Sequence, residues 1–359
     1  MSEQGAVRAG DAAAPERRPA MTLDRGVGLA ILVIALLAPL VLSEYWIAAL
    51  LTQMLILGVV AASLIFLSAY GGMVSLAQVA IYGVAGFALG NLTTNGNTKG
   101  LNLGWAEVPG IAVAILIAVA VAFIFGALAS RSYGIYFLMI TLVFSVIANL
   151  VFGQVTNISG FGGISGIPIP DFLSRTAHPE RLYFVTLAIA VGLYALLRYL
   201  VRTPFGLTLQ GIRDDPVRMR SLGYNVAWHR TLAFAFAGLI AAIGGILFVW
   251  WNAQIAPSTI GLQATIDVLV IAVIGGLYRL EGAWLGALVF VVINNYAPDI
   301  GLISDRFHTL IGVVFLVIVL VSPSGLMGLW EKFTSGRGRR PVVGDITQER
   351  GSGEPTPVG

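Results

Sequence analysis

The chain has 359 residues, no cysteine and a formal net charge of +3. Apolar residues make up 57% of it, charged residues only 11%, and its mean hydropathy is +0.87, whereas soluble domains have roughly 45–50% apolar and about 25% charged residues. These values exclude a soluble fold, and the missing cysteines exclude disulfides, thiolate catalysis and cysteine-based metal sites.

The two ends of the chain differ from its apolar body. Residues 1–26 are rich in Ala, Arg and Pro, so we expect a disordered cytoplasmic tail. The next apolar run is not followed by a small-residue cleavage site, so we do not expect a cleavable signal peptide. Residues 331–359 form a second polar tail, which leaves 27–330 as the membrane domain.

Ten apolar runs between the tails predict an all-α membrane protein, a polytopic bundle of about ten transmembrane helices. The runs are Val27–Leu42, Tyr45–Leu67, Ala69–Leu92, Pro109–Ala129, Gly134–Gln154, Leu182–Val201, Thr231–Trp251, Ala264–Tyr278, Gly282–Tyr296 and Phe307–Val321. The eighth and ninth are shorter than the roughly 20 residues that a hydrocarbon core needs. For these two, a joined pair and broken half-helices both remain open.

Two stretches interrupt the pattern. In the third run, Ser75 and Gln78 follow the pair Gly71-Gly72, which indicates a broken or re-entrant start before the helix. A lipid-facing Gln78 would leave its amide unpaired at a cost of several kcal/mol, so it should face protein or a water-filled path. The second stretch, Thr156–Pro170, is too rich in glycine for a helix and too apolar for a free linker.

The longest charged interruption of the apolar body is Arg202–Arg230. Asp215 can cap a helix, Pro216 suits its first position and Gly223 suits a left-handed end. We therefore predict a short helix over Pro216–Leu222, preceded by another over Leu207–Ile212. An ordinary basic cytoplasmic loop is the alternative, but the cap, the glycine and Leu222 favour a helix that docks in a groove of another protein.

The basic residues also predict the orientation. With the first tail inside, the turns at Arg131 and Arg279, the charged interruption and the second tail also fall inside. Only four of the 21 basic residues then lie outside: Lys99, Arg175, Arg181 and Arg306. Both termini are therefore expected in the cytoplasm.

The sequence contains no set of catalytic or metal-binding groups. Its histidines, His178, His229 and His308, have no partner at metal-ligand spacing, and no phosphate-binding loop pattern occurs. Asp267 is the one acid well inside a predicted span. A proton relay is one interpretation of it, but its position one turn after Gln263 favours capping or helix packing.

Four stretches carry a resemblance to a known family. They are YGGMVSLAQVAIYGVAGF from Tyr70, RSYGIYFLMITLVF with the later SGFGGISGIP, GIRDDPVRMRSLGYNV from Gly211, and IDVLVIAVIGGLYRLEGAWLGA from Ile266. They resemble motifs of the permease subunits of bacterial ABC importers for branched-chain amino acids. The chain departs from these motifs at Arg218, Arg220, Tyr278, Arg279 and Ala283, which bears on the solute rather than on the family.

This resemblance implies a subunit of the bacterial inner membrane that is not itself an enzyme and binds no cofactor or nucleic acid. It implies a second, different permease subunit, two cytoplasmic ATPase subunits that hold ATP and Mg²⁺, and an extracytoplasmic solute-binding protein. In this family the predicted helix Pro216–Leu222 would be the coupling helix, which contacts the ATPases. It and its flanks would do so through Gly206, Arg213, Asp214, Asp215, Pro216, Arg218, Ser221, Leu222 and Gly223. Candidate path residues are Ser75, Gln78, Tyr136 and Thr141, for each of which helix packing is the alternative. Urea or short amides as solutes, or a proton-coupled secondary carrier, remain the alternative functions.

Overall fold

The computed structural model describes residues 35, 46–95, 100–170, 173, 179–296, 312, 316 and 325–328. Both predicted tails lie outside these residues, as do His178, His308 and nearly all of the first and tenth predicted spans. The boundaries of the three predicted regions stay predictions.

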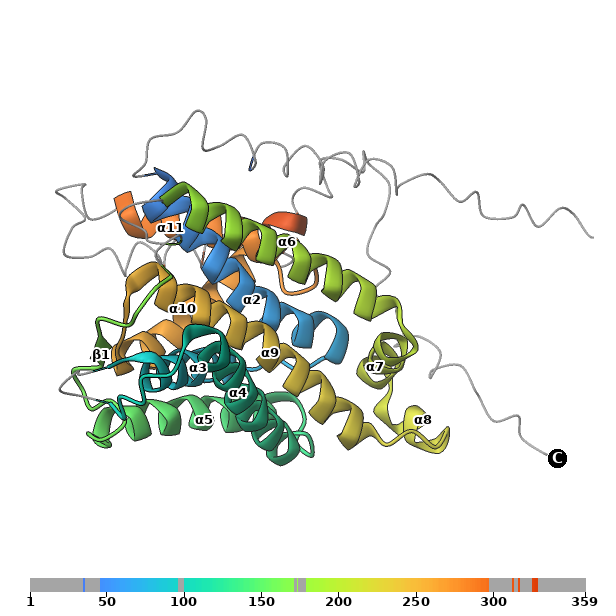
Figure 1. Cartoon of the computed structure of the whole chain (residues 1–359). Helices are drawn as coiled ribbons and strands as arrows, with labels where there is room; N and C mark the ends of the chain where they lie inside the picture. Colours follow the sequence, from blue (N-terminus) through green and yellow to red (C-terminus); the bar gives the residue numbers. More distant parts are fainter. Residues whose placement is uncertain are drawn as a thin grey trace, which may run out of the picture.

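Eight helices occupy the second to ninth predicted spans, and two more lie in the charged interruption (Figure 1). In chain order the ten are α2 Thr52–Gly71, α3 Gln78–Thr93, α4 Glu107–Ala129, α5 Gly134–Gln154, α6 Pro179–Arg202, α7 Pro204–Asp214, α8 Pro216–Ser221, α9 Val226–Asn252, α10 Leu262–Gly275 and α11 Gly282–Tyr296. A π-helical turn, η1 (Trp46–Leu51), leads into α2. Among the described residues, α2, α4, α5, α6 and α9 are long and apolar enough to cross a membrane. The prediction of a helical membrane protein is confirmed.

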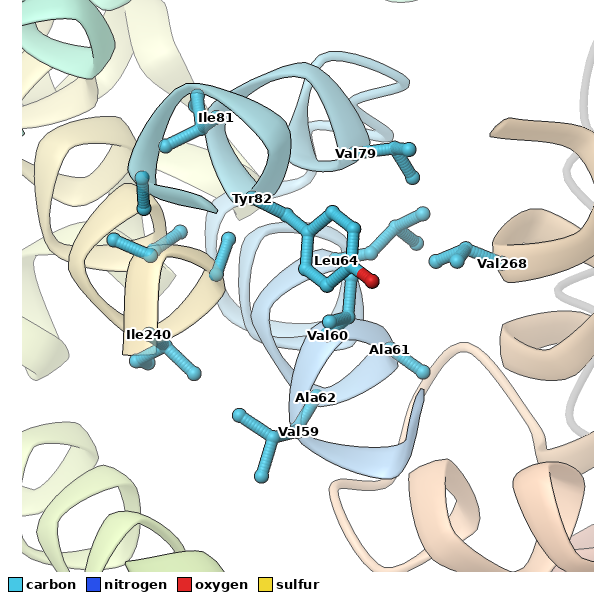
Figure 2. Packing of buried hydrophobic residues seen from close by; sticks show 14 of the residues in the cluster. Val59, Val60, Ala61, Ala62, Leu64, Val79, Ile81, Tyr82, Ile240 and Val268 are labelled. Carbon is cyan, nitrogen blue, oxygen red and sulfur yellow. The ribbon is translucent and has the colours of Figure 1, made fainter. Parts of the chain in front are cut away.

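Three helices, α2, α3 and α9, form the centre of the bundle and are buried along most of their length. Figure 2 shows Val60 and Leu64 of α2 beside Tyr82 of α3, with Val268 of α10 close by. Glycines let these helices approach: a Cβ on Gly245 of α9 would lie 2.1 Å from the carbonyl oxygen of Tyr82. The backbones of α3 and α9 therefore touch, as small residues permit between membrane helices.

The outer helix α4 buries one narrow stripe of small residues. The stripe recurs every fourth residue, at Gly110, Ala114, Ala118, Ala122 and Gly126. Gly110 faces Thr93 of α3, and the later part of the stripe faces α9, where a Cβ on Gly238 would lie 2.3 Å from the Cβ of Ala122. The remaining faces of α4 are apolar and largely exposed, as suits a helix that faces lipid.

Both predicted interruptions are confirmed as breaks in the helices. Gly72 has a left-handed φ of 63° and ends α2, and residues 72–77 are not helical. The glycine-rich stretch is also non-helical, and it contains the short strand β1 (Ile164–Ser165). This strand pairs antiparallel with β2 (Gln254–Ile255), between α9 and the 3-10 turn η3 (Pro257–Ile260). The pair is a minor exception to an all-helical fold.

The eighth and ninth predicted spans are two short helices joined in a hairpin. A Cβ on Gly275 of α10 would lie 1.9 Å from the carbonyl oxygen of Gly282, and one on Gly286 would lie 2.0 Å from that of Ile271. Helices α10 and α11 therefore run antiparallel with their backbones in contact. Of the two interpretations left open by the sequence, this arrangement is the joined pair.

Candidate functional site

Local capping sets the shape of the charged interruption. The Thr203 side chain accepts a hydrogen bond from the Gly206 amide at the start of α7. Asp215 Oδ1 accepts from the amides of Val217 at 3.0 Å and Arg218 at 2.9 Å at the start of α8. Gly223, which follows α8, has a φ of 88°. The predicted cap, short helix and stop glycine are thus confirmed as structure, while α7 begins three residues before the predicted Leu207.

Helix α7 is held firmly against the bundle. Leu209 and Ile212 are buried, and a Cβ on Gly206 would lie 2.4 Å from the Leu200 carbonyl oxygen at the end of α6. Arg213 donates to the carbonyl oxygen of Ala69 in the last turn of α2 and pairs with Asp214 at 2.8 Å. Arg213 and Asp214 therefore pair with groups of this chain.

Helix α8, in contrast, projects from the bundle, and none of its six residues is buried (Figure 1). Val217 is 68% exposed, and Leu222, just after the helix, is 64% exposed. Ser221 donates its hydroxyl to the Val217 carbonyl oxygen, within the helix. The segment therefore presents apolar and basic side chains to its surroundings, as a docking helix does.

A small pocket separates α8 from the turn between α4 and α5. Its volume is about 230 Å³, and Tyr133, Pro216, Val217 and Arg220 line it. Arg220 Nη2 donates to the Tyr133 hydroxyl at 2.7 Å across this pocket. Arg220 thus links the projecting helix to the membrane bundle.

Arg230 is a functional candidate that the sequence analysis did not single out. It is 3% exposed, and it donates to the Ser130 carbonyl oxygen at 2.7 Å and to the Met73 sulfur at 3.0 Å. Its guanidinium also lies 4.3 Å from the centre of the Tyr133 ring. Asn225 caps α9 by accepting a hydrogen bond from the Trp228 amide. In the sequence, this capping residue indicates that Arg230 belongs to a helix rather than to a loop.

Three of the four candidate path residues lie together. The Leu76 amide donates to Thr141 of α5, and the Ala77 amide donates to Ser75. Gln78, at the first position of α3, is fully buried, and neither atom of its side-chain amide has a partner among the described residues. A buried amide of this kind calls for a water or another polar partner.

The fourth candidate, Tyr136, does not join the other three. It lies on α5 but is 72% exposed, on the outside of the described bundle. The inner face of α5 instead carries two further polar contacts. Ser145 bonds the Thr265 hydroxyl of α10 at 2.8 Å, and Asn149 donates to the Pro257 carbonyl oxygen at 2.7 Å.

Two further acids have partners within the bundle. Gln263 donates to Asp267 at 2.9 Å along one turn of α10, which favours the helix-packing interpretation of Asp267. Glu281, in the turn between α10 and α11, accepts from Tyr194 at 2.6 Å and pairs with Arg198 at 3.1 Å, both on α6. No cluster of metal-ligating side chains occurs in the ranges that the structure covers.

The basic turns predicted on one side do lie together at one end of the bundle. Arg230 reaches the end of α4 at Ser130, Arg213 reaches the end of α2, and Glu281 meets the last turns of α6. These contacts bring the ends of α2, α4 and α6 together with the turn between α10 and α11.

Comparison with known proteins identifies the family. The chain is 28% identical over 282 residues to the high-affinity branched-chain amino acid transport system permease protein LivM of Escherichia coli, covering 71% of this chain and 65% of that one. The LivM protein of Salmonella typhimurium is 26% identical over 74% of this chain and 68% of its own length. A nucleoside ABC transporter permease, NupC of Lactococcus lactis, is 28% identical over 44% of this chain and 50% of its own length.

The chain thus spans about two thirds of the length of the LivM proteins, and no solved structure matches it. The family described as the permease component of the branched-chain amino acid transport system matches residues 46–320. This chain is a multi-pass membrane protein that belongs to that permease family.

Proposed function

We propose that the chain is the transmembrane permease subunit of an ATP-driven importer that moves branched-chain amino acids into the cytoplasm. The family match over residues 46–320 carries this proposal. The absence of a phosphate-binding loop pattern in the sequence supports placing ATP and Mg²⁺ on separate ATPase subunits.

The proposed assembly follows from the family and the charge distribution. A second permease subunit completes the path, and an extracytoplasmic binding protein delivers the solute. The basic end of the bundle faces the cytoplasm of a bacterial inner membrane, in line with the positive-inside rule, and both termini lie on that side.

Helix α8 is the proposed contact with the ATPases. Its exposed Val217 and the neighbouring Leu222 supply apolar anchors, and α7 passes a displacement of α8 to α2 through Arg213. Asp214 and Asp215 are engaged within the chain, so their proposed role is to hold the shape of the segment rather than to touch the partner.

The proposed path runs near the break before α3. Gln78 supports this, because its buried amide lacks a partner in the described part of the chain. Ser75 and Thr141 flank it, while Tyr136 has the exposure expected of a face toward lipid or the second permease.

ATP hydrolysis by the membrane complex, purified through a tag on this chain, tests the proposal. Co-purifying ATPase whose activity rises with leucine, isoleucine or valine and the binding protein is expected. Because NupC is related over 44% of this chain, nucleosides belong in the solute panel beside urea and short amides. Stimulation by one of these alone would change the solute, and a folded preparation without ATPase would refute the proposal.

A further inference from the structure

Two guanidinium groups converge on one phenol at the basic end of the bundle. Arg220 of α8 donates to the Tyr133 hydroxyl at 2.7 Å, while Arg230 of α9 lies 4.3 Å from the centre of the same ring. Like charges that approach one side chain repel each other, and the charge of the buried Arg230 is screened less by water than that of the exposed Arg220. A negative charge near the two guanidiniums would relieve this repulsion and be stabilised by both.

The described part of the chain provides no such charge. Two ion pairs of the described residues join Arg198 to Glu281 and Arg213 to Asp214, and neither includes Arg220 or Arg230. Asp215, five residues before Arg220, is the N-cap of α8 and binds two amides there. Neither aspartate beside α8 neutralises the pair of arginines.

The groups that hold Arg230 are also neutral. They are a carbonyl oxygen, a thioether sulfur and the faces of the Tyr133 and Phe137 rings. Burial of a charge is costly unless the charge is paired and hydrogen-bonded. The cluster thus keeps two formal positive charges at the rim of the bundle.

The pocket beside these residues is suited to an incoming side chain. It measures about 230 Å³, and Pro216, Val217, Tyr133 and Arg220 line it. The Tyr133 hydroxyl accepts from Arg220, so its own proton is free to be donated to a ligand in the pocket. The accessible surface of the pocket is apolar, so an acidic side chain would seat its methylene groups there. Its carboxylate would then lie at the rim beside the guanidinium of Arg220 and the hydroxyl of Tyr133, with the field of Arg230 behind the ring.

We infer that this pocket receives an acidic side chain of a cytoplasmic ATPase subunit. This inference rests on the proposed function and names the chemistry of its contact. A protein partner fits better than a lipid phosphate because three of the four lining residues, Pro216, Val217 and Arg220, belong to the projecting α8. The exposed Val217 at the pocket and Leu222 nearby offer the apolar surface that surrounds a buried charge pair in protein interfaces.

The composition of the chain permits a direct chemical test. It contains only two lysines, Lys99 and Lys332. In the Arg220→Lys variant, an amine replaces the guanidinium at the pocket. A water-soluble carbodiimide condenses this amine with a carboxyl group in contact, which forms an amide and releases one water equivalent. The expected product is a cross-linked peptide between position 220 and an Asp or Glu of the ATPase in the purified complex.

Arg218→Lys is the matched control. Arg218 is exposed on the same helix, two residues away, but does not line the pocket. We expect its cross-linked yield to be several times lower than that of Arg220→Lys. A complex that retains its ATPase but gives no link at position 220, or equal links from both variants, would overturn the inference while leaving the proposed function intact.

Charge reversal distinguishes a protein acid from a lipid phosphate. Arg220→Glu is expected to weaken ATPase retention about tenfold, which corresponds to about 1.4 kcal/mol, and Arg220→Lys is expected to keep most of it. The loss should be equal in nanodiscs of phosphatidylcholine with and without phosphatidylglycerol. A loss confined to the anionic discs would assign the pocket to a lipid phosphate. A wild-type complex that contains no ATPase would refute both the proposed function and this inference.

Discussion

Removal of the cap of α8 is the sharpest test of how this helix is maintained. Asp215 Oδ1 accepts two amide hydrogen bonds at 2.9 and 3.0 Å, and no residue of α8 is buried to hold the helix by packing. Asp215→Ala should therefore cost the helix about 1 kcal/mol, within the range of about 0.5–2 kcal/mol for lost N-caps. A loss of about 1 kcal/mol raises the open population roughly fivefold.

Hydrogen exchange at the amides of Met219 and Leu222 measures this opening directly. They donate to the backbone carbonyl oxygens of Asp215 and Arg218, so they keep their acceptors when the Asp215 side chain is removed. We expect Asp215→Ala to speed their exchange by the same factor and to lower solute-stimulated ATP hydrolysis severalfold, with an unchanged level of the chain in the membrane. Asp215→Ser, which retains an acceptor for the cap, should restore most of both.

Asp214→Ala is the matched control. It removes only the exposed pair with Arg213, and such pairs contribute about 0–1 kcal/mol. Its exchange at Met219 and Leu222 should stay near that of the wild type. If Asp215→Ala leaves the exchange unchanged, or if Asp214→Ala accelerates it equally, then the cap does not hold α8 and the reasoning fails.

Three further changes test other parts of the structure. Leu222→Asp should abolish transport and solute-stimulated ATP hydrolysis while the chain still reaches the membrane, because Leu222 is 64% exposed and its loss leaves the fold intact; normal uptake of leucine would contradict the docking role. Gly245→Val should prevent stable folding, since its Cβ would lie 2.1 Å from the Tyr82 carbonyl oxygen. Gly192→Val is the control: a Cβ there has nothing within 4 Å, so the melting temperature in detergent should stay nearly unchanged. Gln78→Leu should keep or raise the melting temperature, since it removes an unpaired buried amide, and should lower the rate of transport; unchanged transport would remove Gln78 from the path.

The sequence was most informative where structure is decided locally. Asp215, Pro216 and Gly223 predict α8 because capping needs only neighbouring residues. The same reasoning was not applied to Thr203, which precedes a proline and caps α7 in the same way. Likewise, α9 begins at Val226, five residues before the predicted Thr231, because Asn225 caps it and hydropathy alone does not register a polar first turn.

Contacts between distant segments were not predictable from local patterns. Arg230 is buried by groups from the end of α4, the start of α5 and the break after α2, which are remote from it in sequence. For α5, helical spacing would have helped: Phe137 lies four residues before Thr141 and so shares its inner face, whereas Tyr136 turns away from it. The structure agrees, since Phe137 is buried and Tyr136 is exposed.

The position of α6 determines how a displacement at the basic end can spread. Its last turns hold Glu281 through Arg198 and Tyr194, and α7 begins two residues after α6 ends. Because α10 and α11 touch backbone to backbone, their hairpin cannot bend between them and must tilt as one rigid body. A push on α7 therefore acts at one end of this hairpin. At the opposite end of α10, segment 253–261 with β2 and η3 is partly buried and hydrogen-bonded, so a tilt of the hairpin would also move α5 through Asn149.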